Sequence, residues 1–170
     1  MLDICDLRSL YRHGLQELHN AAVQAAAFLP VIAPCVTSVQ LRSLVNQQAE
    51  QATRHRLRLA AVLTAHGALN PATVDPAAAA LLCKAESFAA QVGDEDLRDA
   101  ALLSVLRRVA HHGIAACTAT SGHAKALSLL IERHALIAML GELRAAERDL
   151  ADIEEEINQL ALTVSLPAYL

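Results

Sequence analysis

The sequence predicts an all-α protein, a four-helix bundle whose long crossover contains a short fifth helix. Hydrophobic residues make up 54% of the 170 residues but aromatic residues only 2%. Alanine and leucine dominate, which favours helices over strands. Apolar residues recur at three- and four-residue steps through most of the chain. We expect one domain spanning 1–170, with an irregular tail over about 163–170.

Two long helices are expected in the first part of the chain. The first should cover about 6–29, because Pro30 and Pro34 stop it. The second should begin at Thr37 or Ser38, where a threonine precedes a glutamine by three residues in a capping-box pattern. It has one broad apolar face and should end at Gly67.

The second part of the chain begins with a long connection. After a linker over 67–74, an aspartate followed by proline should start a short helix over 76–91. Acidic residues should open a third long helix over 94–117, a turn should cover 118–122, and the last helix should cover 123–162. A connection of this length lets the second and third long helices run parallel, which is a ferritin-like topology.

Composition and targeting signals exclude several classes of partner. With a net charge of −4 and almost no aromatic residues to stack on bases, we expect no nucleic-acid binding. The N-terminus lacks a signal-peptide pattern and no apolar run reaches about 20 residues, so we expect no membrane contact and a cytoplasmic protein. The four cysteines are widely spaced, which is typical of small buried hydrophobes rather than disulfides or zinc ligands.

Four local segments, taken in order, resemble one known family. Residues 6–11 are similar to its opening L-R-D-L-Y, and 97–102 to its R-D-A-A-L-I. Residues 109–116 are similar to its V-E-H-Y-E-I-A-A, and 83–86 to the C-x-A-M of its crossover. The chain thus resembles the YciE/YciF-like branch of the ferritin-like proteins, a bacterial stress-associated family. The resemblance implies a bundle, often dimeric, with a di-metal centre inside.

The residues that such a centre needs are mostly missing. Di-iron bundles use one Glu from each of two helices and Glu-x-x-His from the other two, and this sequence contains no Glu-x-x-His. At the family's acidic positions stand Gly14, Gln51, Ala110, Gly113 and the apolar stretch 135–138. We therefore expect a degenerate member without a di-metal centre, cofactor or catalytic residues, and with a structural or interaction role that is stress-related.

A replacement metal site is the alternative. His55, His111 and His134, with Glu50 as the nearby carboxylate, could form a rearranged site for iron or zinc. The competing interpretation is that these are surface and core-edge histidines. Neighbours on a helix diverge by about 100°, so at most one of His111 and His112 faces the core.

The last helix also suggests a partner. Its apolar residues follow a strict alternating three- and four-residue step, which is typical of a coiled-coil seam. The stretch 135–140 before it is apolar on every side. We expect a homodimer through the last helix; the alternative is that the seam packs against the first helix of its own chain. The seam residues are Leu143, Ala146, Leu150, Ile153, Ile157, Leu160 and Val164.

Overall fold

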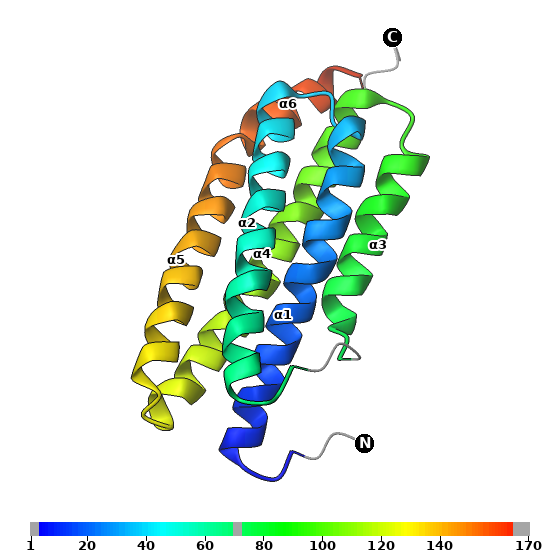
Figure 1. Cartoon of the computed structure of the whole chain (residues 1–170). Coiled ribbons are helices and arrows are strands. Elements are labelled where there is room, and N and C mark those ends of the chain that lie inside the picture. Colours follow the sequence, from blue (N-terminus) through cyan, green and yellow to red (C-terminus); the bar gives the residue numbers. More distant parts are fainter. Residues whose placement is uncertain (1–3, 70–72, 165–170) are drawn as a thin grey trace.

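The computed structural model describes residues 4–69 and 73–164, and within these ranges every regular element is helical. Helices α1 and α2 form one antiparallel hairpin, and α4 and α5 form another (Figure 1). Helix α3 runs back along the bundle, so α2 and α4 point the same way (Figure 1). The predicted all-α bundle with a helical crossover is confirmed. The elements are α1 (Leu7–Ile32), η1 (Ala33–Cys35), α2 (Val39–Ala65), α3 (Pro76–Gln91), α4 (Glu95–Ala126), α5 (Leu130–Asp152) and α6 (Glu154–Val164).

The helices begin where polar side chains accept hydrogen bonds from the first backbone N–H groups. Asp6 accepts from the N–H of Ser9 at 2.6 Å, and Asp94 accepts from the N–H of Leu97 at 2.9 Å. Asp75 accepts from two backbone N–H groups of α3, as the Asp-Pro pattern predicts. At α2 the cap is Ser38 and not Thr37. Capping of this kind stabilises a helix start by about 1 kcal/mol.

Two predicted boundaries in α1 and α4 are wrong. Pro30 lies inside α1, on the exposed side of its last turns, and α1 continues to Ile32. Its missing N–H costs one hydrogen bond there without ending the helix. The predicted turn over 118–122 is helical, and the hydroxyls of Thr118 and Thr120 are satisfied within the helix by donating to carbonyls four residues earlier. The chain turns instead just before α5, where Ser128 adopts φ 59°.

Within the predicted last helix over 123–162, residues 123–126 belong to α4 and most of the remainder forms two helices, α5 and α6. The break between them falls at Ile153, and α6 reaches Val164, so residues 163 and 164 of the predicted irregular tail are helical. Figure 1 shows α6 lying across one end of the bundle. Residues 165–170 of the predicted tail lie outside the described residues.

The seam on the last helix is partly buried inside its own chain. Leu150 and Ile157 are 0% and 3% exposed and pack with residues of α4. Helices α5 and α6 pack mainly on α4. The alternative interpretation of the sequence was that the seam packs against the first helix, α1. Leu160 at the end of the seam is 45% exposed. Contacts within the chain therefore bury Leu150 and Ile157 but leave Leu160 exposed.

Buried large side chains form two separate clusters, one at each end of the bundle. The α6-end cluster comprises Leu29, Ile32, Ala33, Val36, Leu41, Val45, Ala85, Leu102, Leu103, Val105, Leu106, Leu150 and Ile157. The turn-end cluster, near the turn between α4 and α5, comprises Tyr11, Leu15, Leu18, Leu59, Leu63, Cys117, Ala124, Leu136, Met139 and Leu140. Between them lies a middle layer whose buried residues include Ala22, Ala52, Ala78 and Ala110.

Residues of the R-D-A-A-L segment join the helices at the α6 end. Asp99, only 2% exposed, accepts hydrogen bonds from the backbone N–H groups of Thr37 and Ser38 at 2.6–3.1 Å. Arg98 donates to the carbonyl oxygen of Cys35 at 2.9 Å. The most specific part of the family resemblance therefore anchors the connection between α1 and α2 to the start of α4.

One helix is long and apolar enough to cross a membrane by length and composition. It spans Leu7–Cys35 with a mean hydropathy of 1.3, although no such stretch was expected from the sequence. In the bundle 22% of its most apolar 18-residue window is buried. Leu15 and Ile32 are packed against the other helices, whereas Leu10 and Val31 are exposed.

Candidate functional site

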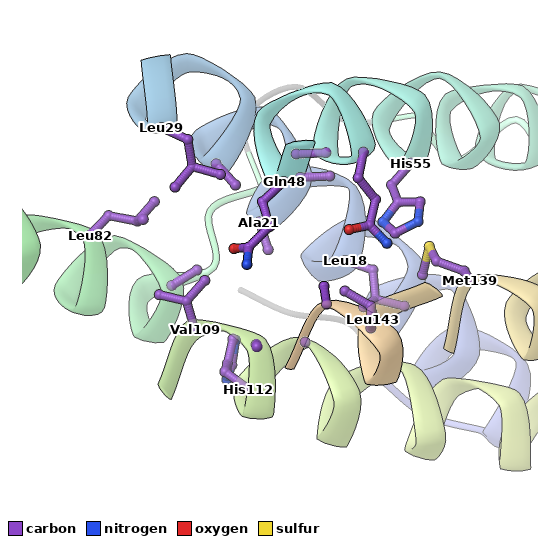
Figure 2. Close-up of a pocket in the computed structure, with 18 of the residues that line it drawn as sticks. Leu18, Ala21, Leu29, Gln48, His55, Leu82, Val109, His112, Met139 and Leu143 are labelled. Carbon is purple, nitrogen blue, oxygen red and sulfur yellow. The ribbon is translucent and has the colours of Figure 1, made fainter. Parts of the chain in front are cut away.

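The middle layer contains a partly open cavity of about 100 Å³ between α1, α2, α3, α4 and α5. Figure 2 shows its lining, to which Leu18, Leu82 and Val109 contribute apolar side chains from three different helices. Alanines and Gly113 leave the space, because their short side chains do not reach the middle of the bundle. The polar residues among the described lining are Gln48, Gln51, His55 and His112. None of the described lining residues is an aspartate or a glutamate.

His55 is the most deeply buried of these polar residues, at 5% exposed. It donates from Nε2 to Glu142 Oε2 at 2.8 Å, across the gap between α2 and α5. Arg58 donates to the other carboxylate oxygen of Glu142 at 2.7 Å. Glu142 is therefore engaged on both oxygens and directed away from the cavity, whose lining does not include it.

The pKa values of His55 and Glu142 are both lowered, for different reasons. Burial lowers the pKa of His55 below its usual 6.5, although Glu142 acts in the opposite direction. Burial also opposes ionisation of Glu142, but the hydrogen bonds from Arg58 and His55 outweigh it and hold the pKa of Glu142 below 4.5. At neutral pH the pair is thus a neutral imidazole that donates to an ionised carboxylate.

His112, on the α4 side of the cavity, connects the crossover to the bundle. Its Nε2 donates to Asp75 Oδ2 at 2.7 Å, and Asp75 is 4% exposed at the start of α3. The backbone N–H of Asp75 donates to Asn20 at 2.8 Å, and Gln24 donates to its carbonyl oxygen at 3.2 Å. His112 is therefore the one of the two adjacent histidines that lines the cavity, and its partner is a structural carboxylate.

The expected acidic positions do not all reach the cavity. Gln51, Ala110 and Gly113 line it. Gly14 lies elsewhere, where α1 approaches α4 so closely that a Cβ would sit 2.7 Å from Thr120 Oγ1. On α5 the lining residues are Met139, Leu143 and Ala146 rather than the stretch 135–138.

The alternative metal ligands are not brought together. Glu50 is exposed and pairs with Arg54 on its own helix at 3.9 Å. The side chain of His111 is 60% exposed and lies 3.3 Å from Glu147, while His134 is exposed on α5. Of the four, His55 alone lines the cavity. Among the described residues, no three His, Cys, Asp or Glu side chains are grouped so that they could hold a metal ion.

Sequence reasoning missed the carboxylate that does face the interior histidine. Glu142 lies one residue before Leu143, the start of the apolar seam. The stretch 135–138, expected at the family's acidic position, lies one to two turns before Glu142 on the same helix. The buried Asp75 and Asp99 were also missed as interior acids, although Asp75 was identified as a helix cap.

One buried polar group at the cavity has no partner. Gln48 Nε2 is shielded from solvent and makes no hydrogen bond with the described residues. Figure 2 shows its amide reaching from α2 into the cavity. Gln48, Gln51 and Ala146 also line a polar groove of about 300 Å³ on the outside of α2 and α5. These three residues lie between the cavity and the groove.

Comparison with known proteins gives consistent matches. Residues 6–163 match the family described as Domain of unknown function (DUF892). YcfI from Rhodopseudomonas palustris, described as a candidate structural protein, has a similar structure with 26% identity and a TM-score of 0.83, covering 88% of this chain and 95% of its own. The E. coli stress protein YciF has a TM-score of 0.86 at 20% identity, covering 92% of this chain and 99% of its own.

The similarity to YciF shows a shared fold. A comparison with curated protein sequences gives no significant match. The resemblance to the YciE/YciF-like proteins is confirmed by the family match together with the two structures. Because the family match spans most of the sequence, the chain belongs to the DUF892 family.

Proposed function

We propose that this protein is a ferritin-like bundle that has lost its di-metal centre and has a structural or interaction role related to stress. The observation that carries the proposal is the lining of the cavity, which includes no carboxylate among the described residues. Two dications inside a bundle need about four carboxylates, because buried charge without compensation is strongly unfavourable. The residues present do not fit a di-metal centre.

The neighbouring carboxylates do not replace the missing ones. Glu142 is held by His55 and Arg58, and Asp75 caps α3 and accepts from His112. Recruiting either one to a metal would break contacts that join helices. The descriptions of YcfI as a candidate structural protein and YciF as a stress protein support the proposed role.

Metal analysis of the purified protein tests the proposal. We expect less than one tenth of an iron, zinc or manganese ion per chain, no ferroxidase activity, and an unchanged melting temperature when these metals are added. A ligand that binds the native state would raise that temperature. Ala119→Leu, at an exposed position of α4, is the control. About one iron or more per chain that is retained in this control but lost in His55→Ala or Glu142→Gln would overturn the proposed function.

We also propose that the protein is a cytoplasmic homodimer formed through α5, with no nucleic-acid or membrane partner. The outward face of the first three turns of α5 is exposed and carries no carboxylate, lysine or arginine. Ile131 is 85% and Leu130 is 71% exposed, and Ala135, Ala138 and Gly141 on the same face are small enough for a second helix to approach closely. The exposed residues of this face are Leu130, Ile131, His134, Ala135, Ile137, Ala138 and Gly141.

Sedimentation at tens of micromolar protein tests the dimer. We expect twice the 18.1 kDa mass of one chain for the wild type. Ile131→Glu should give monomers. Val31→Glu is the matched control, because Val31 is 65% exposed on α1. A wild-type monomer, or a dimer that survives Ile131→Glu, would contradict the proposal.

A further inference from the structure

We propose that the cavity in the middle layer binds a small, neutral, largely apolar molecule of about the size of benzene that carries one hydrogen-bond acceptor. The proposal rests on the metal-free interior proposed above. It adds a ligand to a region that otherwise has a purely structural role.

The size of the cavity sets the size of the ligand. Its volume is about 100 Å³. An engineered apolar cavity of about 150 Å³ in another helical protein stays dry and binds benzene or xenon. A ring of five or six atoms is therefore near the upper limit here. Met139 in the wall is unbranched and flexible, so it can adapt to ligands of slightly different shape.

The walls select an apolar and uncharged ligand. Leu18, Leu82, Val109 and Leu143 present hydrocarbon to the cavity. The lining offers no carboxylate, lysine or arginine among the described residues, so an ionised ligand would lose its hydration without gaining a counter-charge.

Gln48 supplies the polar contact. Its Nε2 is a buried donor without an acceptor, and a donor in that state gains more from a new partner than one already paired. The other buried polar group, His55, already donates from Nε2 to Glu142. A carbonyl or ether oxygen on the ligand would accept the hydrogen bond from Gln48, which fixes the orientation of the ligand.

An entry path lies beside this donor. Gln48, Gln51 and Ala146 line both the cavity and the outer groove. Movement of the two glutamine side chains would connect the two spaces without unfolding a helix.

Thermal unfolding with two probes, benzene and cyclopentanone, tests the proposal. At ten times its dissociation constant, each probe should raise the melting temperature by about 3–6 °C. Ala110→Leu and Ala52→Leu extend a lining side chain into the cavity and should abolish the rise. Ala119→Leu makes the same change at an exposed position of α4 and should keep it. Equal rises in all four proteins, or none in the wild type, would overturn the proposal.

Gln48→Leu tests the acceptor. It should weaken cyclopentanone binding by about 3- to 10-fold relative to benzene, which is what one hydrogen bond contributes. An unchanged ratio of the two affinities would remove the acceptor from the proposal. If neither cavity-filling variant gives a helical circular dichroism spectrum, xenon-pressurised crystals of the wild type decide: xenon between Leu18 and Val109 supports the cavity site, and its absence there contradicts it.

Elemental analysis of the same samples separates the two proposals. Metal-free protein that binds neither probe refutes the ligand alone. Stoichiometric metal that is lost in the His55→Ala variant refutes the proposed function, whatever the probes do.

Discussion

The two ends of the bundle and its middle layer are built on opposite principles. At the ends, leucines, isoleucines, valines and Tyr11 fill the space between helices, and residues such as Leu102 and Leu15 are 0% exposed. In the middle, Ala22, Ala52 and Ala110 leave a cavity. The difference shows where stability and adaptability reside: dense packing at two separated places holds the helices, and the layer between them can tolerate open volume.

The largest effect on this difference in packing is expected from truncating one leucine in each region. Leu102→Ala, in the α6-end cluster, should lower the free energy of unfolding by about 2–5 kcal/mol, because it leaves a new cavity in a packed region. Leu82→Ala should cost less, because Leu82 already borders empty space and has fewer partner atoms to lose. Urea denaturation of both variants measures the difference. Equal losses would mean that the middle layer is packed as well as the ends.

Substitutions at Gly14 and Gly113 test the same difference in packing. Gly14→Ala should destabilise by about 1–3 kcal/mol, because its Cβ would lie 2.7 Å from the Oγ1 of Thr120, a stiff buried side chain. Gly113→Ala should stabilise by about 1 kcal/mol, because its Cβ would lie 3.5 Å from Leu143 and alanine is the better helix former. Adding Thr120→Ala should rescue Gly14→Ala. Opposite signs in thermal unfolding support the comparison, and the same sign in both would contradict it.

The dense turn-end cluster holds one weak point of its own. Tyr11 is 0% exposed, and its hydroxyl makes no hydrogen bond with the described residues. Burial raises the pKa of Tyr11 to about 12, so the hydroxyl stays protonated. Tyr11→Phe should leave the stability unchanged or raise it by up to about 1 kcal/mol, because it removes an unpaired polar group. A loss above about 1 kcal/mol in urea would reveal a partner for the hydroxyl.

The pH dependence of stability tests the middle layer with the smallest expected effect. Because burial lowers the pKa of His55, the unfolded chain takes up this proton first as the pH falls through about 6.5. The free energy of unfolding should therefore decrease from that pH down through the lowered pKa of His55. The charged groups that face it are Glu142 on α5 and Arg54 and Arg58 on α2.

His55→Gln should flatten that part of the profile. His19→Gln is the control, because burial also lowers the pKa of His19, which lies outside the cavity lining. His19→Gln should remove only the contribution of His19 to the pH dependence and should leave that of His55 in place. Glu142 adds a further decrease only below pH 4.5, because its pKa is lowered. A profile of His55→Gln identical to the wild type would show that His55 is not the group responsible.

Local patterns predicted the helices well where the signal was contained in a few neighbouring residues. The Asp75-Pro76 start of α3 is an example, because the cap and the proline act on the same turn. The turn predicted over 118–122 was wrong, since these residues continue α4. In the structure the Thr118 hydroxyl donates to its own helix, while Thr120 is packed against Gly14 of α1.

The candidate site was predicted in part. The absence of acidic side chains at Gln51, Ala110 and Gly113 was evident in the sequence, and all three line the cavity. The sequence could not predict that Glu142 would pair with His55, because the two residues lie on different helices and are 87 positions apart in the chain. It also grouped Glu50, His111 and His134 with His55, although the other three residues point away from the interior.

By itself the sequence determined the helical composition, the crossover topology and the non-acidic residues Gln51, Ala110 and Gly113 that line the cavity. Each of these depends on residue type and spacing along one stretch of chain. Tertiary structure alone decided that α1 approaches α4 at Gly14, that the core divides into two clusters, and that small residues from different helices enclose a cavity. The volume of a cavity depends on how five helices pack together, and no single segment encodes that distance.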